Sequence, residues 1–169
     1  GLAAISPDGA TILILSEREG RLNDLFAMDP DGGNVRRIER DPGMNSTADF
    51  SPDGSRLVLA SLQAAEGNFR NSEIFVLDLE GDEPAMRLTH AWSYDHSADW
   101  SPDGRALAFR RNRGHEHCAI IVSSVTSGRE RELATCPMPT LGLAWAPDGA
   151  SLVIGGRRQP GDAGALKRI

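Results

Sequence analysis

The chain has 169 residues, of which 40% are hydrophobic, enough for the core of one ordinary domain. It contains no run of the roughly 20 apolar residues that a membrane-spanning helix needs, which argues against direct membrane insertion. Its formal net charge of −6 argues against a nucleic-acid partner, because neutralising phosphates requires clustered lysine and arginine.

One four-residue motif recurs four times. Ser-Pro-Asp-Gly occurs at 6–9, 51–54 and 101–104, and Ala-Pro-Asp-Gly occurs at 146–149. Proline fixes φ at the second position of a turn, and glycine accepts the positive φ that closes a hairpin. Short apolar stretches flank each copy, so each motif predicts a tight turn between two antiparallel strands. The strands expected before the turns are 3–5, 48–50, 98–100 and 143–145, and those expected after them are 11–15, 57–60, 106–109 and 151–154.

Two further strands are expected in each repeat. The segments 25–29 and 74–78 are similar, and 119–123 fits the same place less well. Each is followed by a polar turn that contains glycine and then by a fourth strand candidate, at 35–38, 85–89 and 130–134. In the last repeat, 165–169 is expected to be the third strand, with no fourth.

A four-stranded unit of about 45 residues cannot bury both of its faces alone, so the repeats are expected to stack radially. This predicts an all-β fold, a β-propeller of four-stranded antiparallel blades with about four blades present, the last lacking its outer strand. The blades are expected at about 1–42, 43–92, 93–138 and 139–169, within a single domain 1–169. A β-sandwich of similar hairpins is the alternative, but four copies with matching flanks favour the propeller.

Closed propellers usually carry 4 to 8 blades. The chain is therefore expected to be an excerpt of a longer propeller. The alternative is an open half that closes as a homodimer, because an exposed end blade leaves unpaired edges and apolar surface.

The repeat resembles the TolB-like, PD40-type propeller repeat, in which an aromatic residue, Ser-Pro-Asp-Gly, a short apolar strand and an Ile-Phe-Val-Leu-Asp-type strand follow one another. Residues 48–89 match this pattern best, and the resemblance covers essentially the whole chain. The third repeat departs from it, because Ser123 replaces the strand-ending aspartate and Cys118 stands where Asp24 and Glu73 occur.

The resemblance implies a noncatalytic scaffold that binds a protein or peptide partner. It suggests a periplasmic or cell-envelope location, although the cytoplasm is not excluded. Two alternatives follow from the same resemblance: the gating propeller of a prolyl-oligopeptidase-like peptidase, and the sensor region of a membrane-anchored winged-helix regulator. A fold hosts many roles, so the resemblance does not choose the partner.

The sequence offers little for catalysis. It has no Gly-x-Ser-x-Gly nucleophile turn and no glycine-rich phosphate loop, so we expect neither an enzyme nor a cofactor. The aspartates of the repeated motif are expected to stabilise turns rather than hold a metal. His115 and His117, next to Cys118, could point both imidazoles to one side of a strand. A third zinc ligand must come from elsewhere, and candidates such as His96 cannot be placed, so no metal site is predicted.

Partner binding is predicted on the face opposite the Pro-Asp-Gly turns, where loops join the second strand to the third and each blade to the next. The loop 90–96 supplies Trp92 and Tyr94, amphipathic residues that interfaces favour as anchors. Arginines in the neighbouring loops could pair with carboxylates of the partner. The predicted contact residues are His90, Trp92, Tyr94, Asp95, His96, Phe69, Arg70, Arg111, Arg113 and Arg158. The alternative is that Trp92 covers a blade junction and that the arginines are ordinary solvated loop charges.

The two cysteines lie near the ends of one expected hairpin. If this hairpin closes about 126–129, the numbers of opposed residues sum to 254 or 255, and those of Cys118 and Cys136 sum to 254. Opposed residues on antiparallel strands lie near the separation that a disulfide accepts. A disulfide would support an oxidising compartment such as the periplasm, and two free thiols are the alternative.

Overall fold

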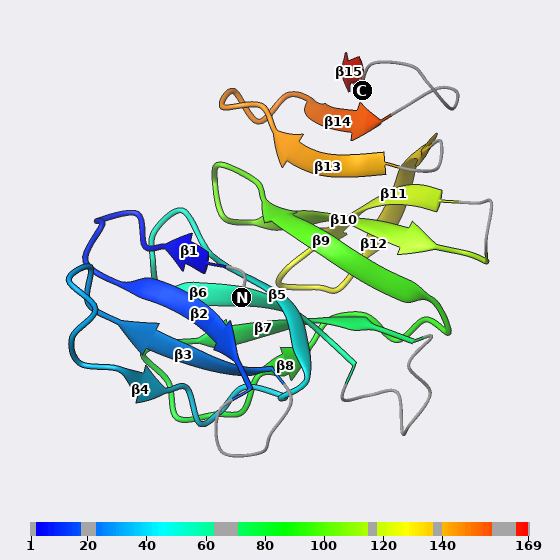
Figure 1. Cartoon of the computed structure of the whole chain (residues 1–169). Coiled ribbons are helices and arrows are strands. Elements are labelled where there is room, and N and C mark those ends of the chain that lie inside the picture. Colours follow the sequence, from blue (N-terminus) through cyan, green and yellow to red (C-terminus); the bar gives the residue numbers. More distant parts are fainter. Residues whose placement is uncertain are drawn as a thin grey trace.

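The computed structural model describes residues 3–17, 23–62, 71–114, 118–136, 140–156 and 165–168. In this part of the chain there are fifteen strands and no helix, and the strands form four antiparallel sheets (Figure 1). The predicted all-β, partial propeller is confirmed, including a last sheet of three strands.

Within each sheet the strands pair in chain order. The first sheet contains β1 (Ala3–Ile5), β2 (Ile12–Ser16), β3 (Asp24–Met28) and β4 (Arg36–Arg37). The second contains β5 (Asn45–Phe50), β6 (Arg56–Ser61), β7 (Glu73–Asp78) and β8 (Met86–Arg87). The third contains β9 (Tyr94–Trp100), β10 (Ala106–Asn112), β11 (Cys118–Ser124) and β12 (Glu130–Cys136). The fourth contains β13 (Thr140–Trp145), β14 (Leu152–Gly156) and β15 (Ala165–Arg168).

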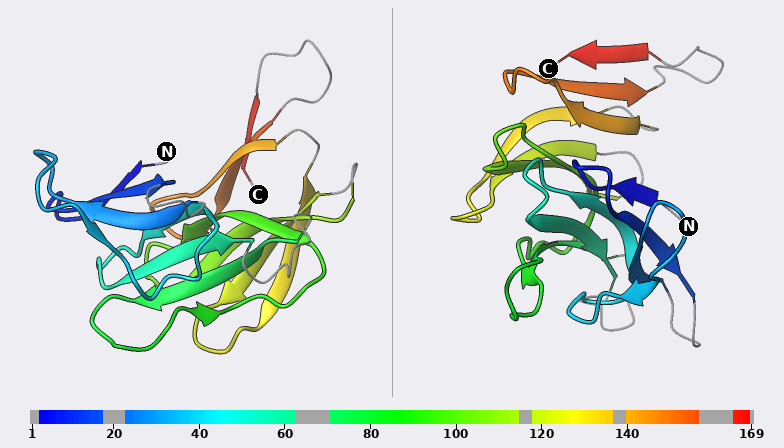
Figure 2. Two further views of the ribbon diagram at one scale, coloured as in Figure 1. Left: turned by 60° about the horizontal axis from the view of Figure 1, so that its bottom comes forward. Right: turned by 90° about the vertical axis from the view of Figure 1, so that its left-hand side faces the viewer.

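The sheets follow one another with their first strands in contact: β1 with β5, β5 with β9, and β9 with β13. Two further views show the sheets fanning out from these strands (Figure 2). This is the radial stacking that the repeat predicts.

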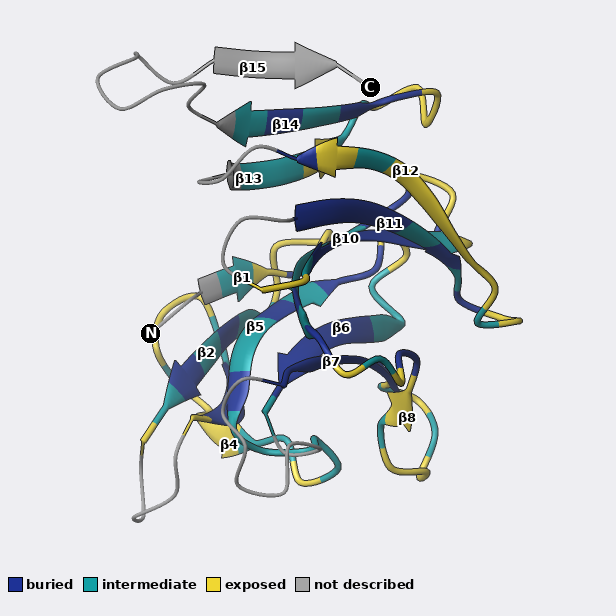
Figure 3. Cartoon of the chain, turned by 90° about the vertical axis from the view of Figure 1, so that its right-hand side faces the viewer, coloured by how far each residue is buried: buried dark blue, intermediate teal, exposed yellow. Residues whose placement is uncertain are grey.

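The middle strands of the second and third sheets bury both of their faces, one against each neighbouring sheet, whereas β2 of the first sheet buries only alternate residues. On β6, Leu57 and Leu59 pack with the first sheet, whereas Val58 and Ala60 pack with the third. All four are at most 2% exposed, and burying one leucine contributes about 1.5–3 kcal/mol. Figure 3 shows burial concentrated in the middle strands and exposure on β4, β8 and the connecting turns.

The Pro-Asp-Gly turns have the predicted geometry. Gly54 has a φ of 74° and its N–H donates to the carbonyl of Ser51 at 2.9 Å. The carboxylate of Asp53 accepts hydrogen bonds from the Ser51 hydroxyl at 2.5 Å and the Ser55 N–H at 3.0 Å. These bonds lower the pKa of Asp53 to about 2, so the aspartate is ionised within its own turn.

Successive turns stack on one another. A Cβ built on Gly54 lies 3.6 Å from Cδ of Pro7, and one built on Gly149 lies 3.7 Å from Cδ of Pro102. The glycine of each turn therefore sits against the proline of the preceding turn.

The first strands of the second, third and fourth sheets begin before the predicted positions, and β13 begins at Thr140 rather than at 143. β5 begins at Asn45 and β9 at Tyr94, each several residues before the expected start. The early part of β9 pairs with β10 beyond a register shift near Ala108, where Ser97 takes a φ of 53°. Its residues are polar, so the alternation of apolar residues that marks a strand is absent there.

Candidate partner-binding face

The loop between β8 and β9 presents the most exposed large apolar side chain among the described residues. The side chain of Trp92 is 89% exposed, and His90 beside it is also exposed. Trp92 therefore does not cover a blade junction. A fully exposed indole is unusual on a protein surface and is the kind of anchor that interfaces use.

The backbone that carries Trp92 is held on its C-terminal side. The N–H of Ser72, just before β7, donates to the carbonyl of Ser93 at 3.2 Å, and the N–H of Asp95 donates to the carbonyl of Ser72 at 2.8 Å. The N–H of Ser93 also donates to the carbonyl of Ala91 at 2.8 Å. These bonds order the loop, and an ordered loop loses less conformational entropy in an interface than a flexible one.

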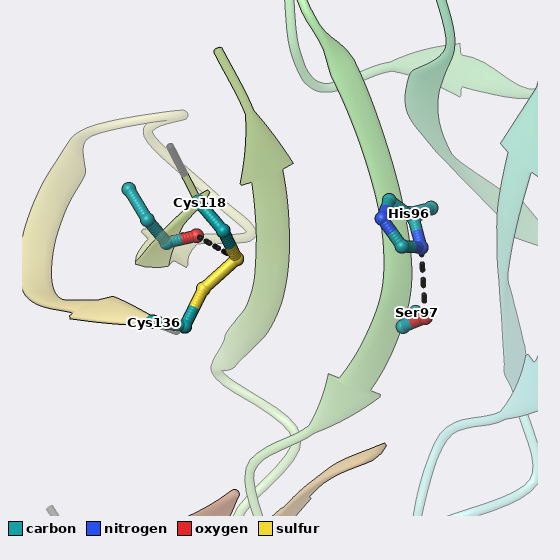
Figure 4. The surroundings of a disulfide bond; sticks show 5 residues. His96, Ser97, Cys118 and Cys136 are labelled. Atoms are coloured by element: carbon teal, nitrogen blue, oxygen red, sulfur yellow. Dashed lines mark hydrogen bonds between the residues drawn. A yellow bond between two sulfur atoms is a disulfide. The ribbon is translucent and has the colours of Figure 1, made fainter. Parts of the chain in front are cut away.

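Tyr94 and His96 lie on one side of β9 and are half-buried. Their ring centroids are 5.1 Å apart, and Nδ1 of His96 is hydrogen-bonded to the hydroxyl of Ser97 at 2.9 Å (Figure 4). Burial, together with the nearby charge of Arg110, lowers the pKa of His96, so its imidazole is neutral at pH 7.

Asp95 and Arg111 are buried rather than displayed. Nε and Nη2 of Arg111 donate to the two carboxylate oxygens of Asp95 at 2.9 and 2.7 Å, and Nη1 donates to Glu130 at 2.6 Å. Burial opposes the charge on Arg111, but these hydrogen bonds outweigh it and raise the pKa of the guanidinium. The two predicted contact residues thus tie β9, β10 and β12 together, and neither is available to a partner in this structure.

Arg113 lies on the surface beyond the end of β10. Its guanidinium pairs with Glu132 at 3.0 Å, and both side chains remain substantially exposed, at 53% and 41%. A pair of this kind contributes little to stability and exchanges readily for another carboxylate. Phe69, Arg70 and Arg158 lie outside the described residues.

The structure explains the acidic position at the start of the third strands. Asp24 pairs with Nε of Arg37 at 3.0 Å, and Glu73 pairs with Nη2 of Arg87 at 2.9 Å. In both sheets the third strand is thereby tied to the fourth. The recurring acidic residue is visible in the sequence. Its arginine partner can be identified only from the pairing of the third strand with the fourth in the structure.

In the third sheet a disulfide takes the place of this ion pair. Cys118 lies directly opposite Cys136 in the β11–β12 register, with Cα atoms 5.0 Å apart, and the two sulfurs are bonded (Figure 4). Both cysteines are buried. Although the third repeat departs from the family pattern, its third and fourth strands are still joined, by a disulfide instead of an ion pair.

A hollow runs along the first strands of the sheets. It has a volume of about 370 Å³, and Asp49 and Asp99 line it. Burial raises the pKa of both carboxyl groups. Asp99 accepts a hydrogen bond from the N–H of Trp145 at 2.6 Å, so it connects the third sheet to the fourth.

No group of three or more metal-ligating side chains gathers among the described residues. His115 and His117 lie outside them, and Cys118 is in the disulfide. None of the described segments forms a helix of the length and hydrophobicity needed to cross a bilayer.

Comparisons with known proteins match both the repeat and the fold. The family model PD40, the TolB beta propeller domain, matches residues 38–162. Among solved structures, TolB from Acinetobacter baumannii superposes with a TM-score of 0.79 at 24% identity, covering 100% of this chain and 40% of that one. The β-propeller domain of the Trilobed protease from Pyrococcus furiosus superposes with a TM-score of 0.68 at 17% identity, covering 99% of this chain and 52% of that one.

Two sequence relatives are named as peptidases. The uncharacterized peptidase YuxL of Bacillus subtilis is 28% identical over 149 residues, which are 88% of this chain and 20% of the relative. Dipeptidyl-peptidase 5 of Arthroderma otae is 31% identical over 122 residues, which are 61% of this chain and 16% of the relative. The chain thus spans about a fifth or less of the length of these relatives.

Proposed function

Because the chain belongs to the TolB β-propeller family, we propose that it is a noncatalytic scaffold that binds a protein or peptide partner through the loop carrying Trp92. The observation that carries this proposal is the 89% exposure of an indole on a loop whose backbone is already hydrogen-bonded. His90 and Arg113 are also exposed, so a partner with an apolar side chain and a carboxylate fits this surface.

Peptides selected from a random library against the chain test this proposal. The change Trp92→Ala is expected to weaken the selected peptides by about 30-fold or more, because an aromatic hot spot contributes roughly 2 kcal/mol or more. Val35→Ala is the control, since Val35 is also exposed, at 40%, but precedes β4 near the opposite rim. Peptides that bind the Trp92→Ala protein as tightly as the wild type would remove this surface from consideration.

A second function is favoured by the relatives that are described as peptidases. In this case the chain is the propeller portion of a peptidase, and the same loop contacts substrate peptides on their way to a catalytic domain. Sequencing the whole reading frame and assaying its product separates the two. An α/β-hydrolase segment whose peptidase activity changes with Trp92→Ala favours the peptidase, and its absence favours the scaffold.

The disulfide supports an oxidising location such as the periplasm, since structural disulfides are rare in the cytosol.

Closure of a ring by two copies is supported by the exposure of Ile5, which is 63% exposed. A solution mass equal to one chain would count against the homodimer.

A further inference from the structure

Arg56 makes an unusual contact between the second and third sheets. It begins β6, and its Nη2 donates to the carbonyl of Gly104 at 2.9 Å, in the turn of the next sheet. Its guanidinium carbon lies 4.9 Å from the centroid of the Trp100 ring. Nη2 also lies 4.0 Å from the carboxylate of Asp53, in its own turn. A carbonyl, an aromatic ring and a carboxylate thus surround one guanidinium.

The same position one sheet earlier is Thr11, since Arg56 and Thr11 each lie four residues after the proline of their turn. The counterparts of the three partners are all present there: Gly54, Phe50 and Asp8. Gly54 and Gly104 have similar φ values, 74° and 67°, so the two turns present their backbone alike.

The space that Arg56 fills at one junction is open at the other. A Cβ built on Gly104 lies 3.3 Å from Nη2 of Arg56, whereas one built on Gly54 meets only Pro7 within 4 Å among the described residues. A cleft of about 510 Å³ lies at this place, and Thr11, Gly54, Phe50 and Asp8 line it. Threonine is too short to reach across the junction as arginine does.

The charges on the cleft wall suit a cation. Hydrogen bonds from the Ser6 hydroxyl and the Ala10 N–H lower the pKa of Asp8, and both donors contact the same oxygen, Oδ1. Asp53 lines the cleft too and is also ionised at neutral pH.

The arginines of the wall are mostly engaged. Arg37 pairs with Asp24 and Glu39. Arg40 donates to the backbone carbonyls of Asp78 and Glu83 at 3.0 and 3.1 Å. Arg36 is exposed and adds one positive charge on the outer side. The lining also includes Leu13 and Leu79, which can pack against the aliphatic stem of a long side chain.

We propose that this cleft binds an arginine side chain of a peptide or protein partner, in the manner in which the chain's own Arg56 is bound at the next junction. The guanidinium stacks on Phe50, donates to the carbonyl of Gly54 and pairs with Asp8. Lysine cannot stack and fork in this way, so arginine is preferred. The site lies on the rim of the Pro-Asp-Gly turns, opposite the Trp92 loop, and does not depend on the proposed function.

The test uses N-acetyl-arginine methylamide as the probe in an NMR titration of the ¹⁵N-labelled chain. We expect saturable shifts of the Phe50, Gly54 and Ser55 amides, and binding at least several-fold weaker for the lysine and norleucine amides. Thr11→Arg places a guanidinium in the cleft from within and is expected to abolish these shifts. Asp8→Asn is expected to weaken binding by up to about fivefold.

The matched control is Ala106→Arg, which introduces an arginine at the same motif position of the third turn. This variant is expected to leave the Gly54 shifts unchanged, and a dispersed spectrum verifies that each variant is folded. The converse variant, Arg56→Thr, is expected to open a second site whose occupancy shifts the Gly104 amide. Equal shifts with arginine and norleucine amides, or undiminished binding by a folded Thr11→Arg protein, would overturn the proposal.

Discussion

Arg111 is a charged residue that has become part of the core. Its guanidinium is held by Asp95 and Glu130 and is only 7% exposed. Asp95→Ala leaves Glu130 as a partner of the buried guanidinium but removes the acceptor of its Nε–H, so it is expected to lower the free energy of unfolding by about 2–3 kcal/mol. Arg113→Ala removes an exposed pair and is expected to cost less than about 1 kcal/mol. Urea denaturation measures both, and equal effects would contradict the distinction.

Asp99 should make stability depend on pH. Burial raises its pKa, so the folded protein holds this proton more tightly than the unfolded chain. Its contribution is fully present below the unfolded pKa and is lost as the pH rises through the folded pKa. An asparagine side chain does not titrate, so the Asp99→Asn variant is expected to gain in Tm relative to the wild type as the pH is raised from 4 to 7.

For Asp53, the dependence of stability on pH is expected to have the opposite sign. Its folded pKa is lowered to about 2, so its contribution is present above the unfolded pKa and is lost as the pH falls through the folded value. Asp53→Asn is therefore expected to lower the Tm at pH 7 and to approach the wild type near pH 2 to 3. Thermal unfolding scans between pH 2 and pH 7 measure the Tm of Asp99→Asn and Asp53→Asn relative to the wild type. If this Tm difference changed with pH in the same direction for both variants, the assigned pKa shifts would be wrong.

At the scale of the element, the β11–β12 hairpin is closed covalently. Its cysteines are separated by 18 residues, and a disulfide closing a loop of this size stabilises by about 3 kcal/mol. Replacing both by alanine is expected to lower the free energy of unfolding by about this amount, as measured by chemical denaturation. Mass spectrometry with and without reductant checks the bond itself, and two free thiols without reductant would contradict it.

The strands and turns also show how much of the structure could be predicted from the sequence. The Pro-Asp-Gly turns and the apolar middle strands could be placed because turn chemistry and alternation are local signals. The start of β9 at Tyr94 could not, because its pairing with β10 rather than its composition makes it a strand. Asp95 and Arg111 were expected at the surface for the same reason, since residue type says nothing about a partner across the sheet. The exposure of Trp92 depends on how the sheets pack, so it likewise could not be predicted from the local sequence.

At the scale of the whole molecule, a side chain's role depends on which sheet precedes it. Phe50 and Trp100 stand at the same motif position as Ile5, directly before the turn. Phe50 is 9% and Trp100 5% exposed because each packs against the preceding sheet, whereas Ile5 is 63% exposed.

This difference predicts unequal costs for one substitution. Phe50→Ala is expected to lower the free energy of unfolding by about 3–5 kcal/mol, because it leaves a cavity at a junction. Ile5→Ala is expected to change it by less than about 0.5 kcal/mol, as for other surface positions. Denaturation midpoints of the two variants provide the comparison, and a large effect of Ile5→Ala would contradict this radial order.

The stacking of each glycine on the proline of the preceding turn also bears on how such chains arise. One motif supplies a proline to the turn after it and a glycine to the turn before it, as with Pro52 and Gly54. A repeat that keeps the motif therefore brings its own half of each of these two contacts with it. Whole repeats can be duplicated or exchanged by recombination without compensating changes in their neighbours, whereas a single lost glycine damages a contact that belongs to two repeats.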